Sequence, residues 1–544
     1  MAKKKDELKN KNNVNNENID FEEVYLSRGQ LMWRAFKKNK LAMFGLWILI
    51  IMYIVMFAAD FLAPYNPFDQ SLKHSYAPPT KVSSVYKVKD FEQKVGLHVL
   101  PCTSYVDKLD YTRKTRQLLF PSRLTLEYKG KVITLVVNNA KYFPRNEFPG
   151  EVINTDKIQF SLKKEEYAFV GGKWIKLSSS SEKTDYLVFG INDSILTDGE
   201  AFVENDTRTA KNVIFGKYSF KLRVNSEDEI EKVGLKYYIN YIKYTDENGK
   251  TKILMGKDLK VLDFDYKYYP IKWFVKSWGP KEKDYGRVGY ILWVIPLKHH
   301  LFGVDNYDNN PFVKLYILGS DQFGRDVWSR IIFASRISLS IGFIGLAITL
   351  TLSLFFGGIA GYYGGMADEL LMRFTEIIMS IPGFYLLILL RSLLPLDMPS
   401  SQIYILLVFI LSFIGWAGRA RIIRGMVLSI KRNEFVEAAV ALGYPDRKIL
   451  WKHVIPNTMT YMIVTSTLAI PGYILGEAGL SFLGLGIREP SASWGLMMAR
   501  AQDIYVLQSA PWLLIPGIFI FVTVLAFNFV GDGLRDAFDP RALG

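Results

Sequence analysis

The chain has 544 residues, of which 49% are apolar and 22% carry a charge, and its formal net charge is +14. A wholly soluble protein would contain fewer apolar residues, and a protein lying entirely within a bilayer would contain fewer charged ones. We therefore expect a membrane-spanning part joined to a separate polar part.

The amino-terminal 40 residues form two segments of different character. Residues 1–26 are rich in Lys, Asn and Glu, which predicts a disordered tail. Residues 27–40 mix basic side chains with the apolar residues Leu31, Met32, Trp33 and Phe36. This mixture predicts an amphipathic helix along the inner membrane surface. The alternative is a basic flank that only fixes the topology.

Six segments are apolar enough and long enough for the roughly 20 residues that cross a bilayer. They are 41–63, 337–363, 370–394, 400–418, 458–480 and 510–531. Glu376, Pro382 and Arg391 interrupt the third segment, and packed helices tolerate such breaks. The first segment is too long for the core of a cleaved signal peptide, so we expect it to remain as a signal anchor.

Basic residues orient these spans. Ten Lys or Arg lie within the first 40 residues and eight lie within 419–452, and such clusters stay on the cytoplasmic side. Both termini and 434–457 are then cytoplasmic, and 66–312 is extracytoplasmic. Three arginines before the second span conflict with this orientation, although acidic neighbours soften the conflict. They are Arg325, Arg330 and Arg336.

The segment 66–312 is long enough to form a domain with its own core. Within it, 123–137 and 235–254 alternate apolar and polar residues around turn sequences, which predicts β-hairpins in a β-rich domain. Aromatic residues at strand spacing are typical of a core, and a binding surface is the alternative. Cys102 is the only cysteine, so no intrachain disulfide can form.

The segment 434–457, EFVEAAVALGYPDRKILWKHVIPN, is polar and lies between two apolar spans. Ala438 and Ala439 offer a small-residue face that would fit a groove on a partner, and Glu437 offers a carboxylate to a basic residue there. Gly443 is suited to the left-handed conformation that ends a helix. These features favour a docking element.

A second short helix is expected within the same segment. Asp446 follows Pro445 and is suited to be its N-cap, and Pro456 is expected to end it. His453 lies in this second helix, where we expect a structural or partner-contact role.

Catalytic motifs are nearly absent from the sequence. Gly249-Lys250-Thr251 is similar to the end of a phosphate-binding loop, but Tyr244 occupies the position that such a loop reserves for glycine. The five histidines show no metal-ligand spacing. We therefore expect a chain that is not an enzyme and holds no metal or cofactor.

Several segments resemble the C-type permease of oligopeptide and dipeptide ABC importers. Glu437-Ala438-Ala439, Gly443 and Pro456 match the spacing of the EAA loop by which such permeases dock on their ATPases. Further matches are LAPYNP at 62–67, GSDQFGRDVWSRIIFASRISLSIG at 319–342, DELLMRFTEIIMSIPG at 368–383, GEAGLSFLGLG at 476–486 and FNFVGDGLRDAFDPR at 527–541.

The resemblance implies an α-helical subunit of six spans with the type I ABC importer permease fold, in a bacterial inner membrane, with an inserted β-rich domain. Its implied partners are a second permease of the B type, two ATPase subunits that bind ATP and Mg²⁺, and an extracytoplasmic solute-binding protein. Peptides are the expected cargo. Nickel, opines and oligosaccharides are alternatives because related permeases share these motifs. No nucleic-acid partner is expected.

Two features depart from the family pattern. The insertion after the first span is much longer than in related permeases, and Arg391 lies near the outer end of the third span. An intramembrane arginine is either functional or reaches the outer headgroups.

An outer gate between helices is expected at Glu477, Ser481 and Phe482, where small residues permit close packing. For Glu477 we expect structural pairing with an arginine of the partner permease rather than contact with the cargo.

Two other protein classes compete with the permease interpretation. A secondary carrier would need internal repeats and ion-binding carboxylates at mid-membrane, which the sequence does not offer convincingly. A membrane-anchored receptor built on 66–312 would not need six spans.

Overall fold

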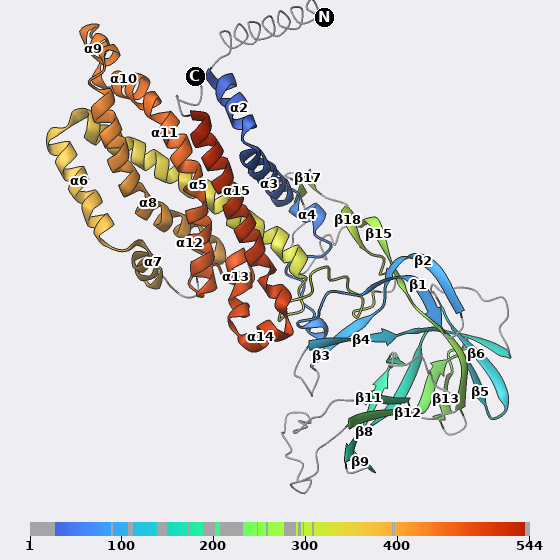
Figure 1. Ribbon diagram of the computed structural model, residues 1–544. Helices are drawn as coiled ribbons and strands as arrows, with labels where there is room; N and C mark the ends of the chain where they lie inside the picture. The colour runs from blue at the N-terminus through green and yellow to red at the C-terminus, as the bar shows by residue number, and fades with distance from the viewer. Residues whose placement is uncertain are drawn as a thin grey trace, which may run out of the picture. The chain divides into compact units, whose positions relative to one another are not determined.

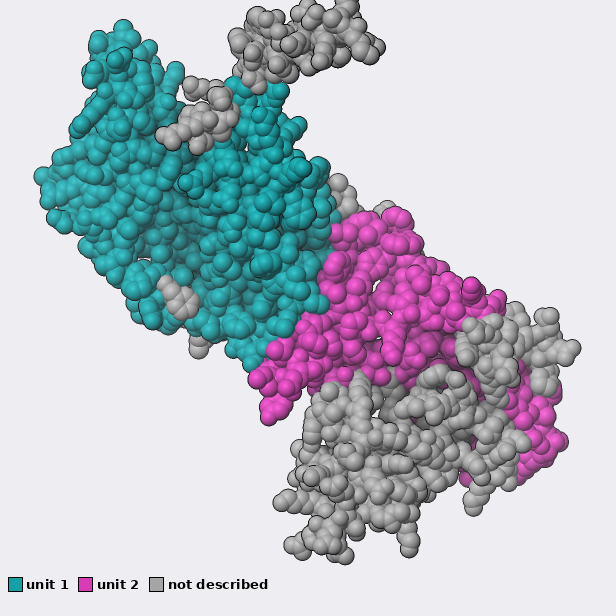
Figure 2. Space-filling view, viewed as in Figure 1, with its two compact units in different colours: residues 1–59, 331–502, 514–544 teal, residues 60–330, 503–513 magenta. Residues whose placement is uncertain are grey.

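The computed structural model describes most of the chain. The described residues are 28–88, 91–106, 113–138, 150–170, 173–185, 187–188, 202–206, 232–246, 248–256, 259–276, 290–291, 295–296, 299–306, 309–393, 395 and 398–538. Two compact units are present, which we call the helical unit (1–59, 331–502 and 514–544) and the strand unit (60–330 and 503–513; Figure 2). The tail predicted at 1–26 lies outside the described residues.

The helices follow one another along the chain as Figure 1 labels them. The earlier ones are α2 (Arg28–Lys38), α3 (Lys40–Phe57), α4 (Ala59–Leu62), α5 (Val327–Tyr363), α6 (Gly365–Ser380), α7 (Gly383–Ser392) and α8 (Ser400–Ile430). The later ones are α9 (Glu434–Ala441), α10 (Asp446–Ile449), the π-helical turn η3 (Leu450–Val454), α11 (Ile455–Thr467), α12 (Ile470–Phe482), α13 (Trp494–Met498), η4 (Ala499–Gln502), α14 (Ile504–Ser509), η5 (Pro511–Leu514) and α15 (Ile515–Phe538).

Five helical stretches among the described residues are long and apolar enough to cross a bilayer. They are Lys40–Phe57, Val327–Tyr363, Ser400–Ile430, Asp446–Phe482 and Pro511–Phe538, and the bent pair α6 and α7 makes a sixth if it counts as one span. Several bounds differ from the predicted ones. The helix α5 begins at Val327 rather than at 337, and α8 continues to Ile430 rather than ending at 418.

The third predicted span, 370–394, is not one straight helix. It is broken between α6 and α7, and the two parts are bent by 89°. Ile381 is extended, with φ −94° and ψ 125°, because the ring of Pro382 disfavours a helical conformation in the residue before it. Proline also lacks the N–H that would continue the helical ladder.

The early start of α5 depends on buried acidic groups. One carboxylate oxygen of Asp326 accepts from the Ser329 amide (2.9 Å) and from the Ser329 hydroxyl (2.6 Å), so Asp326 caps the helix. Asp321 accepts from Nε of Arg325 at 2.7 Å and lies 3.5 Å from Nε of Arg330. Both arginines are buried.

Close packing in the helical unit relies on small residues. A Cβ added to Gly45 of α3 would lie 2.7 Å from the Ala526 carbonyl oxygen of α15, and one added to Gly357 of α5 would lie 2.4 Å from the Ala420 carbonyl oxygen of α8. Such contacts let helix backbones approach where lipid offers no hydrophobic driving force.

Strands fill the segment predicted to be β-rich. They are β1 (Val82–Val88), β2 (Phe91–Val99), β3 (Cys102–Val106), β4 (Arg113–Leu119), β5 (Pro121–Tyr128), β6 (Lys131–Val137), β7 (Glu151–Thr155), β8 (Ile158–Val170), β9 (Lys173–Thr184), β10 (Leu187–Val188), β11 (Phe202–Asp206), β12 (Lys232–Thr245), β13 (Thr251–Met255), β14 (Leu259–Tyr266), β15 (Tyr269–Lys276), β16 (Tyr290–Ile291), β17 (Ile295–Pro296) and β18 (His299–Val304). Over the described residues, the sheet orders are β1-β2-β15-β18, β10-β4-β3, β11-β12-β8-β9 with β13 on β12, β14-β5-β6-β7, and β16-β17.

Both predicted hairpins are confirmed. The strands β5 and β6 pair antiparallel with Tyr128 opposite Lys131, so that Lys129 and Gly130 form the turn. Their φ values of 51° and 74° are those of a type I′ turn, whose twist matches that of the strands. The strands β12 and β13 pair around 246–250 in the same antiparallel sense.

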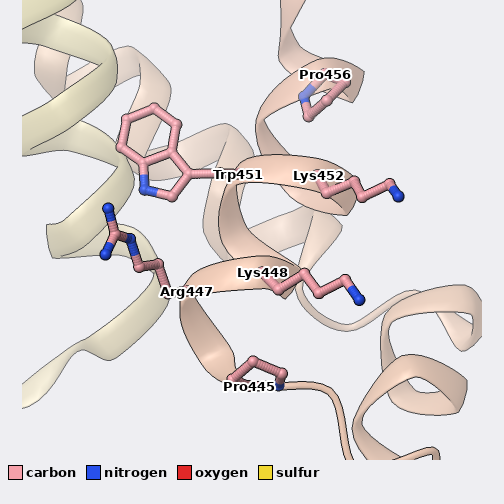
Figure 3. Close-up of a pocket in the computed structure, with 6 residues that line it drawn as sticks. All are labelled: Pro445, Arg447, Lys448, Trp451, Lys452 and Pro456. Atoms are coloured by element: carbon pink, nitrogen blue, oxygen red, sulfur yellow. The ribbon is translucent and has the colours of Figure 1, made fainter.

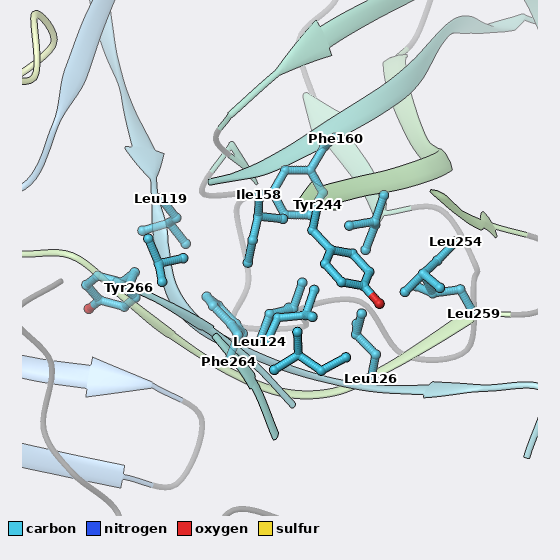
Figure 4. Packing of buried hydrophobic residues seen from close by; sticks show 14 residues of the cluster. Leu119, Leu124, Leu126, Ile158, Phe160, Tyr244, Leu254, Leu259, Phe264 and Tyr266 are labelled. Atoms are coloured by element: carbon cyan, nitrogen blue, oxygen red, sulfur yellow. The ribbon is translucent and has the colours of Figure 1, made fainter. Parts of the chain in front are cut away.

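A hydrophobic core of the strand unit lies between the sheet of β5 and the sheet of β12 (Figure 4). Its aromatic members are Phe160, Tyr244, Phe264 and Tyr266. These aromatic residues fill a core, as expected, rather than a binding surface.

A buried ion-pair group joins β5 to β14 beside this core. Arg123 donates from Nε to Asp265 and from Nη2 to Asp263, both at 2.7 Å, and its side chain is almost fully buried. The attraction between the arginine and the two carboxylates offsets the cost of removing their charges from water. This holds only while the arginine and its acidic partners are all present.

Backbone hydrogen bonds close the base of the insertion. The amide of Tyr76 donates to the Asp321 carbonyl (2.9 Å), that of Ser320 to Ala77 (2.8 Å), and that of Thr80 to Tyr316 (2.8 Å). We call this paired region, 76–80 with 316–321, the neck.

His74 and Cys102 are two buried residues of the strand unit. The Nε2 atom of His74 lies 2.8 Å from the Cys102 carbonyl oxygen, and Nδ1 lies 2.8 Å from the Ser71 hydroxyl. Burial raises the pKa of the Cys102 thiol to about 11, so the thiolate is scarce at neutral pH.

Replacing Arg123 with Ala is expected to destabilise the strand unit by about 3 to 5 kcal/mol, because two carboxylates would remain in a poorly solvated site. Hydrogen exchange of β5 and β14 in the full chain would measure this as faster opening. The control is Lys157→Ala, which removes a surface ion pair with Asp185 and should change stability by less than about 1 kcal/mol. Equal exchange in both variants would contradict the assigned role.

Acid is expected to weaken the strand unit through His74. Burial lowers the pKa of His74 to about 4, whereas an unfolded histidine titrates near pH 6.5. The folded state therefore binds fewer protons, and stability falls as the pH drops from about 6.5 toward 4, by about 2 kcal/mol between pH 7.5 and pH 5.

Hydrogen exchange at those two pH values would test this expectation. His74→Gln should reduce the pH dependence, whereas His299→Gln, at an exposed position, should retain it. An unchanged dependence in His74→Gln would exclude His74 as its source.

Candidate functional site

The segment 434–457, which we call the coupling segment, begins with α9. This helix ends in a Schellman turn, in which the Tyr444 amide donates to the Ala439 carbonyl (3.2 Å) and the Gly443 amide donates to Val440 (2.9 Å). Gly443 has φ +73°, a conformation that glycine adopts without steric cost. The predicted end of the first helix is therefore present.

One face of α9 is buried against its own chain. Val436 and Ala439, one turn apart, join a cluster with Leu450 of η3, Tyr362 of α5 and Val427 of α8. The expectation that Ala439 faces a partner together with Ala438 is thus wrong, because the three-residue spacing from Val436 turns Ala439 inward.

The opposite face of α9 is exposed. It carries Glu437 and Ala438, together with large apolar side chains at Phe435, Val440 and Leu442, the last with 77% of its surface accessible. Large apolar side chains that are exposed close together are typical of a surface that a partner covers.

Basic residues line an open pocket of about 660 Å³ on the following turns. Its lining residues are Pro445, Arg447, Lys448, Trp451, Lys452 and Pro456. Figure 3 shows Lys448 and Lys452 on one side of the helix and Arg447 and Trp451 on the other. This surface would attract an acidic partner.

The second half of the segment differs from the prediction. Pro445 is the N-cap residue of α10 and Asp446 is its first residue, so Asp446 is not the cap. Pro456 does not end the helix either, because it lies in the first turn of α11, where no N–H is needed. The π-helical turn η3 joins the two helices, and the half-buried ring of His453 lies 5.9 Å from that of Tyr444.

A polar contact joins this segment to the end of α5, and a second one joins the ends of α5 and α8. The hydroxyl of Tyr362, near the end of α5, donates to the Asp446 carboxylate at 2.9 Å. Lys431, which follows α8, donates to the Tyr362 carbonyl at 2.6 Å. Sequence reasoning missed Tyr362 and Lys431, because neither lies within the recognised motif.

Glu477 lies inside the helical unit. Its carboxylate accepts from Ser481 of α12 (2.6 Å) and from Ser338 of α5 (3.4 Å), and it is fully buried. Ser481 also accepts from the Ile487 amide, whereas Phe482 is half-exposed. Glu477 therefore pairs with serines of its own chain, and its pairing with an arginine of the partner permease stays a prediction.

Arg391 of α7 packs against its own chain. Its side chain is buried, and its Nε donates to the Leu485 carbonyl at 2.6 Å. The contact ties α7 to the turn after α12. Among the described residues, no three His, Cys, Asp or Glu side chains converge as a metal site requires.

Comparisons with known proteins cover this same part of the chain. The model of the family "binding-protein-dependent transport system inner membrane component" matches residues 353–544, and that of the "N-terminal TM domain of oligopeptide transport permease C" matches 27–79. The oligopeptide transport system permease protein OppC of Haemophilus influenzae is 45% identical over 227 residues, which are 42% of this chain and 70% of that protein. The chain belongs to this permease family.

Other relatives and one solved structure extend the comparison. The dipeptide transport system permease protein DppC of Bacillus subtilis is 41% identical over 41% of this chain and 68% of that protein. The MetNI methionine ABC transporter is 18% identical over 40% of this chain and 96% of that chain, with a TM-score of 0.30, too low to support an argument. Residues 80–352 of the permease lie outside both family matches.

Replacing Glu477 of the permease with Gln is expected to leave assembly intact and to retain part of its transport activity. Glutamine keeps hydrogen-bonding partners for the serine hydroxyls, which alanine would leave unsatisfied at a cost of about 1 to 3 kcal/mol. Solute uptake by the reconstituted complex would measure the effect, with Glu477→Ala as the matched variant. Complete loss of uptake in a normally assembled Glu477→Gln complex would instead assign the charge to the pathway.

Proposed function

We propose that this chain is the C-type permease subunit of an ABC importer for oligopeptides or dipeptides. It would form half of the translocation pathway beside a second permease of the B type. The observation that supports this most directly is the 45% identity to an oligopeptide permease protein over 227 residues of the chain. A dipeptide permease protein at 41% identity supports the same class of cargo.

Two ATPase subunits are the proposed source of energy, and one of them docks on the coupling segment. ATP and Mg²⁺ are then bound by those partners. The exposed Leu442 and Val440 would enter an apolar groove, and Glu437 would pair with a basic residue at its edge. The lysines of the neighbouring pocket add attraction to an acidic surface.

Force on the docked helix would reach the membrane part through its buried face. Val436 and Ala439 pack against residues near the ends of α5 and α8. The Tyr362 to Asp446 hydrogen bond adds a direct link to α5. A displacement of α9 must therefore shift these helices or break the cluster, which is how a packed core converts local movement into a switch between two arrangements.

The proposed orientation places both termini and the coupling segment in the cytoplasm, with the strand unit outside. The basic residues around the coupling segment support it. Three arginines before the second span would favour the opposite orientation, and one of them, Arg325, is paired with Asp321 of the same chain. A solute-binding protein would then deliver cargo on the side of the strand unit.

Replacing Leu442 with Asp is expected to weaken ATPase docking about tenfold or more, since a buried apolar contact would become a charge without a partner. Glu437→Gln and Gly443→Val should uncouple solute from ATP hydrolysis without unfolding the helical unit. Co-purification with the ATPases and solute-stimulated ATP hydrolysis are the measurements.

Met255→Asp is the matched control, because it changes an exposed apolar residue of the strand unit. It should leave docking unchanged. Undiminished stimulated hydrolysis in all three variants of the coupling segment would remove the basis for its proposed role.

A further inference from the structure

Two large aromatic side chains on β15 are exposed. Trp273 has 72% and Phe274 has 63% of its surface accessible, although the strand lies within a sheet. The ring of Trp273 meets Phe302 of the neighbouring strand β18 edge to face, at 6.2 Å. Side chains of this size are normally buried in water-soluble domains. Their exposure therefore indicates a surface that another molecule covers.

The backbone at this point is held in an unusual conformation. Phe274 has φ +55°, in the left-handed region, where a bulky residue other than glycine is uncommon. Successive residues on a regular strand point to opposite faces, but here both neighbours are exposed. Unfavourable backbone conformations are concentrated at functional sites, and this one exposes two neighbouring aromatic rings.

The position of these rings along the membrane normal follows from their contacts. The Phe274 ring lies 6.4 Å from that of Phe61, and Nδ1 of the buried His300 on β18 lies 2.9 Å from the Asp60 carbonyl oxygen. Asp60 and Phe61 come directly after α3. At 18 residues, α3 is about 27 Å long and just crosses the hydrocarbon layer. Residues 60 and 61 must therefore lie at the membrane boundary.

The surface of α3 supplies a second, independent indication. Its exposed apolar residues Trp47, Ile51 and Ile54 recur at helical spacing and form a stripe that lipid must cover. Ala58 and Phe61 continue this spacing beyond the end of the helix.

We propose that Trp273 and Phe274 insert into the interfacial layer of the bilayer and anchor the strand unit to the membrane surface. The partner is lipid, because the Phe274 ring contacts Phe61, which follows the end of the membrane-crossing helix α3 by only four residues. Aromatic rings are favoured at that depth, where an apolar body and a polar tip are both accommodated. The inference requires only that α3 spans the membrane, so it does not depend on the cargo or on which side the strand unit lies.

Single spin labels in the full permease complex, reconstituted in proteoliposomes, would test this proposal. Cys102 is the only cysteine, so a Cys102→Ala background accepts one label at a time. Phe274→Cys and Trp273→Cys report on the two proposed sites separately, should one variant fold poorly. Ile253→Cys, at an exposed position on β13, is the water reference, and Ile51→Cys is the lipid reference.

Collision rates with oxygen and with a water-soluble nickel chelate would locate each label. The expected result at 273 and 274 is an oxygen-to-nickel ratio between those of the two references, which places the label at the interface. A ratio equal to that at 253 would overturn the proposal in favour of free solvent exposure. Protection from both reagents would also overturn it, by showing that a protein partner covers the rings.

Discussion

Polar groups inside a bilayer must be satisfied within the protein, because hydrocarbon offers no hydrogen-bonding partner. The helical unit meets this constraint by joining helices distant in sequence. Thr349 of α5 and Tyr473 of α12 share a hydrogen bond of 2.6 Å, and Ser412 of α8 donates to the Gly345 carbonyl of α5. The serines that donate to Glu477 satisfy a buried carboxylate in the same way. These contacts specify which helix faces meet, whereas apolar packing alone would permit sliding.

The same requirement explains where irregular backbone is found. The break between α6 and α7 is flanked by contacts that hold both parts. Arg424 of α8 pairs with Asp368 of α6 through two hydrogen bonds, and Arg391 of α7 donates to the turn after α12. The bend is therefore supported from both sides, and its origin in Pro382 is local.

Rules that depend only on residues close in sequence predicted many structural features of this protein. The turn at Lys129-Gly130, the left-handed Gly443 and five of the six apolar spans all depend on residues close in sequence, and each is present among the described residues. Predictions failed where distant residues decide. The start of α5 needs buried pairs such as Arg325 with Asp321, and Ala439 turns inward because α8 and η3 cover that face. The burial of Glu477 could not be read from its neighbours in sequence, since Ser338 lies 139 residues away.

The neck has a consequence for how such a chain could acquire a large extra domain. Because the segments 76–80 and 316–321 are hydrogen-bonded to each other, the two ends of the insertion are fixed close together. The entropy of closing a loop grows only with the logarithm of its length, so each doubling costs about 0.6 kcal/mol. A loop whose ends are already joined can therefore be lengthened at little thermodynamic cost to the helices that carry it. The length of the strand unit can thus change at little cost, while the pairing of 76–80 with 316–321 must be kept.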